Sequence, residues 1–387
     1  MRVVQLDLIR GVALLGIFVI NITLFAYSET GQIEFYRQLG AFFPTMENGL
    51  GDFIYSHVML TSYSLVYALF SQKMMTLFSF LFGASIILIT EKLAQKHGTS
   101  LAVFYRRNFW LMVIGCLHLS LWYGDILFVY AVAGFLLYPL RRMSAPLLVG
   151  LSLPMYALCI VYIGPALAGH YYDDATQAAV TASTGLSFDE LKTIKYFSMS
   201  MANMLVGMAL YKTGYITGNA SRRVYRNWAI YGLLAGLVLQ GLALVLDGAY
   251  GYGIYLDLNS LAAILQAMAY IGILVIWSQS DKLLGLQLRF QAIGRAALTH
   301  YLLQTLVSVV LFYPLLFNLR AVEIDFLQQM MVVLAVWILQ LSLGKVLMEK
   351  CHYGPVEWLW RSLYYWQRQP FMRQKSNPDD GAVPSRS

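Results

Sequence analysis

Charge is scarce in this chain of 387 residues. Only 12% of its residues are charged, whereas 59% are hydrophobic and the mean hydropathy is +0.60. A soluble protein of this size keeps about a quarter of its residues charged. The low charge content therefore excludes an ordinary soluble domain. Because long apolar runs recur along the whole length, the sequence predicts an all-α fold, a polytopic transmembrane helical bundle.

Cysteine is also rare, with only Cys116, Cys159 and Cys351. None of them forms a C-x-x-C pair, and the first two lie inside apolar runs. This pattern predicts neither a disulfide framework nor a metal site. The chain also lacks a Walker motif. Its Gly-rich stretch at 248–258, "GAYGYGIYLDL", follows no predicted strand, so it is no nucleotide-binding fingerprint.

The net charge of +7 would point to nucleic acid in a soluble protein. Here the basic residues cluster between the apolar runs, so membrane topology explains them better and no nucleic-acid partner is expected. A stretch of about 20 apolar residues crosses a bilayer. Ten such spans are predicted, near 8–27, 74–91, 108–123, 126–140, 146–165, 197–214, 228–246, 259–278, 297–317 and 328–348.

The basic residues also predict the orientation. Ten spans put both termini on one side, and placing the termini in the cytoplasm leaves only four basic residues on the outer side, namely Arg37, Lys192, Lys195 and Arg320. Lys73 stays near a helix end. The stretch 53–70 could be an eleventh span, but charge weakly disfavours that model. Because His57 and several hydroxyls make a poor lipid-facing surface, a surface or re-entrant helix is preferred there.

The extramembrane parts are short. Within 166–196, "SFDE" predicts a capping box from Ser187 to Glu190 that opens a helix. Residues 1–363 are expected to form the transmembrane domain. Residues 364–387 are expected to form a cytoplasmic tail, disordered from about residue 369.

Two titratable residues, His118 and Asp125, lie in the apolar stretch "GCLHLSLWYGDILFVYA". Only 33 residues separate the arginine pairs at 106–107 and 141–142, whereas two full spans need about 40. This spacing predicts a short hairpin that turns at Gly124–Asp125, with its tip recessed below the outer surface.

Two interpretations of these residues stay open. His118 could bond a neighbouring helix, and Asp125 could cap the second arm of the hairpin. Alternatively, ionisable residues at membrane depth mark a functional site. Two helical turns separate the pair by about 10 Å, too far for a direct bond unless the hairpin folds back.

Charged residues also lie at the predicted inner ends of spans. Asp7 and Arg10 are spaced i, i+3, so they share a helix face and can neutralise each other. In "AIGRAALTHYLLQTL", Arg295 and Thr299 are spaced i, i+4 and are expected on one face. Both arginines suit a cytoplasmic anchor as well as a phosphate. After Gly354–Pro355, a Trp-rich helix is expected to lie on the inner leaflet.

Five blocks, in order, resemble the bacterial YeiB family, which is built around domain of unknown function 418: "LDLIRGVALLGIFVIN", "KMMTLFSFLFGASI", "RRNFWLMVIGCLHLSLWYGDILFVYAVAGF", "IGRAALTHYLLQTL" and "GPVEWLWR". The most family-typical part is about 200–363. One departure is His300, where the family pattern usually has asparagine, so no catalytic role is assigned to it. The resemblance implies a bacterial inner-membrane protein surrounded by membrane lipids.

The YeiB family is in turn distantly similar to transmembrane acyltransferases such as heparan-alpha-glucosaminide N-acetyltransferase. That similarity implies transfer of an acyl group from a cytoplasmic CoA thioester to a glycan or other small acceptor at the outer face. Acyl-CoA would be a substrate, with no permanently bound cofactor. His118 and Asp125 would be catalytic, and the donor would bind near Asp7, Arg10, Arg106, Arg107 and Arg295.

Two other functions are kept open. A proton-coupled transporter of a small solute or lipid would use His118 and Asp125 to carry protons. A structural or signalling membrane protein would need no chemistry at all. The oligomeric state is not predicted, and a homo-oligomer is left open.

Overall fold

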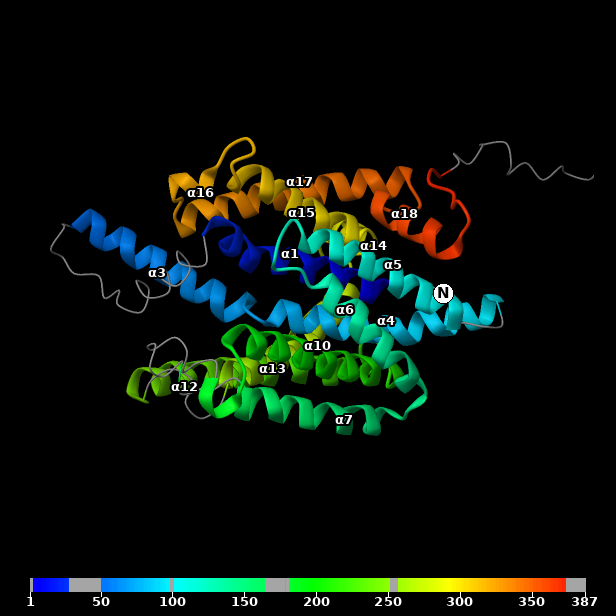
Figure 1. The fold of residues 1–387 in the computed structure, drawn as a ribbon, viewed down its shortest axis with the longest axis horizontal. Helices are drawn as coiled ribbons and strands as arrows, with labels where there is room; N and C mark the ends of the chain where they lie inside the picture. The colour runs from blue at the N-terminus through cyan, green and yellow to red at the C-terminus, as the bar shows by residue number, and fades with distance from the viewer. Residues whose placement is uncertain are drawn as a thin grey trace, which may run out of the picture.

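The computed structural model describes residues 3–27, 50–97, 101–163, 178, 181–250 and 257–373. These parts are helical and contain no strand, apart from an isolated antiparallel bridge between Cys351 and Met372. The predicted all-α class is confirmed. The long helices run roughly along the longest axis of the molecule (Figure 1).

Helices coincide with every predicted span. The elements of the first half are α1 (Val4–Ala26), α3 (Leu50–Phe70), α4 (Lys73–His97), α5 (Leu101–Leu119), α6 (Leu127–Leu137), η2 (Tyr138–Arg142), α7 (Ala145–Ala157), η3 (Leu158–Ile163) and α10 (Phe188–Lys212). Those of the second half are α11 (Arg222–Asn227), η4 (Trp228–Gly232), α12 (Leu233–Tyr250), α13 (Leu258–Ser278), α14 (Leu284–Arg295), α15 (Ala297–Phe312), α16 (Leu319–Val322), α17 (Phe326–Lys350) and α18 (Pro355–Tyr365).

Fewer helices are long and apolar enough to span a membrane than the ten spans predicted from the sequence. Among the described residues five helical runs qualify, and a sixth does if α14 and α15, bent by 85°, count as one. The five are Val4–Ala26, Ile54–Gln95, Ala145–Ile163, Leu258–Ser278 and Phe326–Lys350. The count of ten crossings and the cytoplasmic position of the termini stay predictions.

The ambiguous stretch 53–70 belongs to α3, which continues into α4 as one run of 42 residues, Ile54–Gln95 (Figure 1). At 1.5 Å per residue this run is about 63 Å long, roughly twice the hydrocarbon thickness of a bilayer. Residues 54–70 therefore belong to the same apolar helical run as α4. The surface or re-entrant position expected for 53–70 stays a prediction.

Helix α1 lies in the middle of the bundle. In Figure 1 α17 lies on one side of it, and α4, α10, α13 and α7 lie on the other, while contacts join α1 to α4, α13, α14, α15 and α17. Most of its apolar side chains between Leu6 and Ala26 are buried, and Val12, Ile20 and Leu24 are partly exposed. An apolar helix that is buried nearly all round forms the core of a bundle.

The backbones of α1 and α14 touch where they cross. A Cβ atom added to Gly11 would lie 2.0 Å from the Phe290 carbonyl oxygen, and one added to Gly294 would lie 1.9 Å from the Asp7 carbonyl oxygen. Small residues let membrane helices approach this closely. The crossing holds the end of α14 beside the start of α1.

Two local expectations for helix boundaries can be compared with the structure. The Ser187–Glu190 capping box is confirmed at the start of α10. In the tail, where disorder is expected from about residue 369, residues 369–373 bond to the two preceding helices. Trp358 Nε1 of α18 donates to the Gln369 carbonyl at 2.7 Å, and Arg373 N donates to the carbonyl of Lys350, the last residue of α17, at 2.9 Å. The remainder, 374–387, lies outside the described residues.

The α1–α14 crossing gives the first testable prediction. Gly294→Val should lower the free energy of unfolding by about 1–3 kcal/mol, because overpacking forces two helix backbones apart. The matched control is Gly285→Val on the same helix, where an added Cβ meets nothing within 4 Å. Thermal unfolding of both variants in detergent measures the effect. Equal stability of the two variants would contradict the close crossing.

Candidate functional site

The hairpin between α5 and α6 folds back on itself. Trp122 N donates to the His118 carbonyl oxygen at 2.9 Å, which turns the chain at the end of α5. The Asp125 Oδ2 atom then accepts from Phe128 N at 2.8 Å and starts α6. Gly115 allows the two arms to approach, since a Cβ there would lie 2.5 Å from Phe128 N. The turn therefore returns Asp125 to the level of His118.

His118 uses both ring nitrogens. Its Nδ1 atom lies 2.7 Å from Asp125 Oδ1, and its Nε2 atom lies 2.8 Å from Thr305 Oγ1 on α15. The side chains of His118 and Asp125 are 2% and 0% exposed. The separation of about 10 Å that a straight helix would impose is avoided because the hairpin folds back. The two predicted catalytic residues thus lie in direct contact.

The partners of His118 determine its tautomer. An ionised carboxylate only accepts hydrogen bonds, so with Asp125 ionised the Nδ1 atom carries the proton. In the neutral ring the Nε2 atom is then an acceptor, and the Thr305 hydroxyl donates to it. This arrangement orients a basic nitrogen toward a hydroxyl group. Within the described part of the chain, no group of three or more His, Cys, Asp or Glu residues could hold a metal ion.

Thr305 was missed in the sequence-based prediction. It lies in the same quoted block as Arg295, and with Tyr301 and Ser308 it forms a polar row on one face of α15. That row, inside an otherwise apolar span, is the signal that could have found it. The Tyr301 ring lies 5.1 Å from the His118 ring, centroid to centroid. By contrast, His300 is 1% exposed and neither of its ring nitrogens has a hydrogen-bond partner among the described residues.

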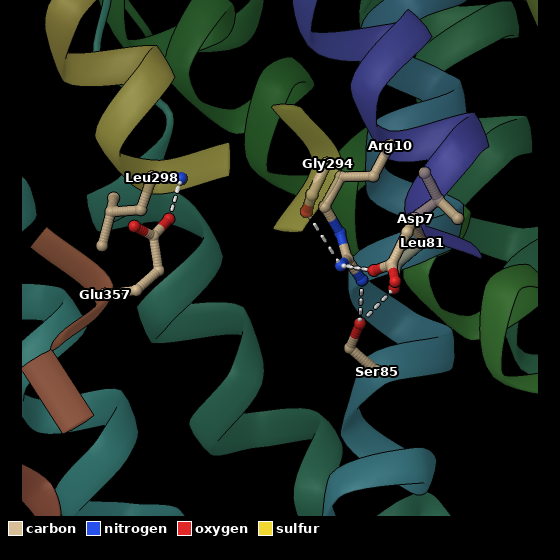
Figure 2. A network of polar contacts seen from close by, with 7 residues as sticks. All are labelled: Asp7, Arg10, Leu81, Ser85, Gly294, Leu298 and Glu357. Carbon is tan, nitrogen blue, oxygen red and sulfur yellow. Dashed lines mark hydrogen bonds and ion pairs between the residues drawn. The ribbon is translucent and has the colours of Figure 1, made fainter. Parts of the chain in front are cut away.

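Arg10 connects three helices near the start of α1 (Figure 2). Its Nη2 atom donates to Ser85 Oγ on α4 at 3.0 Å, and its Nη1 atom donates to the Gly294 carbonyl oxygen on α14 at 3.4 Å. The predicted partner Asp7 lies 3.5 Å away. Because the Arg10 side chain stays 23% exposed, it is accessible to a ligand. Arg295 follows Gly294 directly, so α14 ends beside this cation.

The arginine pair of α5 packs on tryptophans at the C-terminal end of the described chain. Arg106 lies over the Trp366 ring at 4.6 Å and Arg107 over the Trp360 ring at 4.5 Å. Trp360 Nε1 also donates to the Arg107 carbonyl oxygen at 2.9 Å. Arg107 itself is buried, with 8% exposure. Arg10, Arg107 and the end of α14 are together called the cationic region below.

One expected pairing is wrong. Arg295 and Thr299 do not share a helix face, because the chain bends by 85° between α14 and α15. Glu357 of α18 binds the start of α15. Its Oε1 atom accepts from Leu298 N at 2.6 Å (Figure 2). The same atom accepts from Thr299 N at 3.1 Å, and Oε2 accepts from Thr299 Oγ1 at 2.5 Å. Burial raises the pKa of Glu357, and the hydrogen bonds from Thr299 oppose that rise.

Arg107 and His118 lie on one face of α5. The buried residues of α5 are Phe104, Arg107, Asn108, Leu111, Gly115 and His118, which recur at helical spacing. Arg107 and His118 lie three turns apart, about 16 Å along the axis at 1.5 Å per residue. Helix α5 therefore sets the distance between the cationic region and the imidazole.

Comparisons with known proteins find one family model and relatives that align over nearly the whole chain. Residues 210–367 match the family model described as "Protein of unknown function (DUF418)". The chain is 28% identical to the "Uncharacterized protein YeiB" of Escherichia coli (strain K12), over 94% of this chain and 96% of the relative. It is 26% identical to the "Uncharacterized protein YxaH" of Bacillus subtilis (strain 168), over 96% of each chain. No solved structure matches.

Together, the apolar helices and the buried polar centre define a helical protein of the membrane-spanning class. The matches to the relatives extend over nearly their whole length. The chain is therefore related to YeiB and YxaH over nearly its whole length, and its residues 210–367 match the DUF418 model. The matched domain, 210–367, includes α14, α15 and α18, and so contains Thr305 and Glu357 but not His118.

The Glu357 contact gives the second prediction. Glu357→Gln should lower the free energy of unfolding by about 1–3 kcal/mol, because the amide nitrogen of glutamine cannot accept from the Thr299 hydroxyl and its neutral oxygen accepts more weakly than a carboxylate from Leu298 N and Thr299 N. Glu349→Gln on α17 is the control, since the Glu349 side chain is 60% exposed. Thermal unfolding in detergent measures both. A control variant as unstable as Glu357→Gln would contradict the capping role.

Proposed function

We propose that this protein is a transmembrane acyltransferase, which moves an acyl group from a cytoplasmic CoA thioester to a hydroxyl or amine acceptor at the outer face. The observation that carries the proposal is the buried His118, bonded to the Asp125 carboxylate through Nδ1 and to the Thr305 hydroxyl through Nε2. Acyl transfer needs a base that works near neutral pH, and histidine is the side chain suited to it.

The carboxylate makes the imidazole a better base for this reaction. Asp125 fixes the tautomer of His118 and stabilises the imidazolium that forms when Nε2 takes a proton. The Nε2 atom is already oriented toward a hydroxyl group, that of Thr305, at 2.8 Å. This geometry is typical of a general base acting on an alcohol.

The cationic region near Arg10 and Arg107 fits the donor. CoA carries phosphate groups, and arginine binds phosphate through charge-assisted hydrogen bonds. Its thioester lies at the end of a long pantetheine arm. Arg107 and His118 share the buried face of α5 about 16 Å apart, so phosphates at Arg107 would leave the arm directed along α5 toward His118.

The hairpin tip suits an acceptor that arrives from the other side. In Figure 1 the turn between α5 and α6 lies short of the end of the molecule where α16 is found. The Asp125 side chain is fully buried there. A recessed tip excludes bulk water from the reacting groups, which strengthens their electrostatic interactions. A glycan or other small molecule with a free hydroxyl is the acceptor class that this base would activate.

The same buried pair also fits a second function. His118 and Asp125 form a hydrogen-bonded titratable couple inside an apolar bundle, which is what a proton-coupled transporter needs. The two functions differ in their need for CoA. A transporter would bind no CoA, whereas an acyltransferase must.

Binding of the donor gives the third prediction. Arg107→Gln and Arg10→Gln should each weaken the binding of CoA to the purified protein about tenfold or more, because each removes a charged hydrogen-bond donor to phosphate. Arg222→Gln removes an exposed arginine on α11 and serves as the matched control. Isothermal titration in nanodiscs measures the affinities. No CoA binding by the unmodified protein would favour the transporter.

The imidazole gives the fourth prediction. His118→Asn should lower the rate of acyl transfer from acetyl-CoA by about 10²–10⁴-fold, since asparagine keeps a hydrogen-bonding side chain but cannot act as a base. Release of CoA is measured with membrane fractions as the acceptor source, and thermal unfolding checks the fold. A folded variant with full activity would show that His118 only joins helices α5, α6 and α15.

A further inference from the structure

We propose that Thr305 carries the acyl group during transfer, as an ester on its Oγ1 atom. This inference rests on the proposed acyltransferase function and names the residue that would make that reaction proceed in two steps. Three side chains form a continuous chain of hydrogen bonds: Asp125 Oδ1 to His118 Nδ1 at 2.7 Å, and His118 Nε2 to Thr305 Oγ1 at 2.8 Å.

The order of these groups is that of an activated nucleophile. A carboxylate holds the imidazole, and the imidazole holds the hydroxyl, so the hydroxyl proton has a basic nitrogen within hydrogen-bond distance. A residue that only joined helices would need no such order. Each side chain comes from a different element: His118 from α5, Asp125 from the turn before α6, and Thr305 from α15.

Two buried donors without a hydrogen-bond partner among the described residues lie near this chain of bonds. The Trp122 ring centroid is 6.0 Å from that of His118, and its Nε1 atom is unpaired. Ser308 lies one turn beyond Thr305 on the same helix face, and its hydroxyl is unpaired as well. Unpaired buried donors cost free energy unless they serve a ligand. They are the kind of donor that stabilises the oxyanion formed when a hydroxyl attacks a carbonyl.

Thr305 also lies at a suitable depth. It is seven residues after Leu298, whose backbone nitrogen is bound by Glu357 at the start of α15. Seven residues correspond to about 10 Å along the helix. Thr305 is therefore placed between the cationic region at the α14–α15 bend and the hairpin tip.

The reaction balances with these groups alone. His118 Nε2 takes the proton of the Thr305 hydroxyl while Oγ1 forms a bond to the thioester carbonyl carbon. The carbon–sulfur bond breaks, and the CoA thiolate takes the proton from the imidazolium. In the second step the acceptor hydroxyl gives its proton to Nε2 and attacks the Thr305 ester, and the released Thr305 oxygen takes that proton back. No oxidant, reductant or metal is required.

The test uses p-nitrophenyl acetate, a small activated ester that needs no CoA site. The full-length protein in nanodiscs should release a burst of about one nitrophenolate per protein, the kinetic sign of an acyl intermediate. Mass spectrometry of the quenched protein should find the acetyl group on the peptide that contains Thr305. Thr305→Ser should keep the burst, and Thr305→Val should abolish it.

Ser120→Ala is the matched control. Its exposed hydroxyl lies two residues after His118, so a non-selective reagent would label it first. The control should leave the burst unchanged. No burst, an acetyl group on another residue, or an undiminished burst in folded Thr305→Val would overturn the proposal.

Different results would contradict the proposed function and the Thr305 ester. A burst on Thr305 together with no binding of CoA would support the nucleophile and remove the CoA donor. Conversely, acetyl transfer from acetyl-CoA with no acetylated Thr305 would keep the acyltransferase and overturn the intermediate, because transfer would then be direct.

Discussion

The position of α15 depends on the hydrogen bonds made to the backbone N–H groups of its first turn. The 85° bend after α14 interrupts the helix and leaves backbone N–H groups without intrahelical partners. In an apolar bundle such groups cannot hydrogen-bond to water, and each unpaired group costs free energy. The Glu357 carboxylate of α18 binds two of them and the Thr299 hydroxyl. This contact allows α15 to start at the bend, and α15 in turn brings Thr305 to His118.

Further buried polar bonds fix α15 against its neighbours. Gln304 donates to the Leu14 carbonyl of α1 at 3.4 Å and to Gln340 of α17 at 3.0 Å, and Gln340 donates to the His300 carbonyl at 2.8 Å. Apolar packing alone specifies helix register weakly in a membrane, where lipid is as apolar as the side chains. These amides therefore hold three helices in one register, and the geometry around His118 follows from it.

The fold class, the hairpin that carries His118 and Asp125, and the candidate arginines could be predicted from the sequence. The contacts that these residues make could not. Apolar runs located the helices, and residue spacing predicted a hairpin with His118 and Asp125 near its tip. The direct His118–Asp125 contact depends on how the turn folds back, which periodicity does not contain. The Arg295–Thr299 pairing failed for the same reason, because the bend at Ala296 is stabilised by Glu357, 61 residues later in the sequence. Long-range polar contacts of this kind leave no local pattern.

The uninterrupted α5 has a consequence for substrate choice. Arg107 and His118 belong to one rigid helix, so no loop movement can change the distance between them. Under the proposed function, the fixed distance along α5 would favour donors whose phosphates and thioester are the same distance apart. Short thioesters without the nucleotide would then lose turnover as well as affinity, since the binding free energy of the distant phosphates is what places the reacting carbon. Discrimination between donors would reside in the length of a helix rather than in the shape of a pocket.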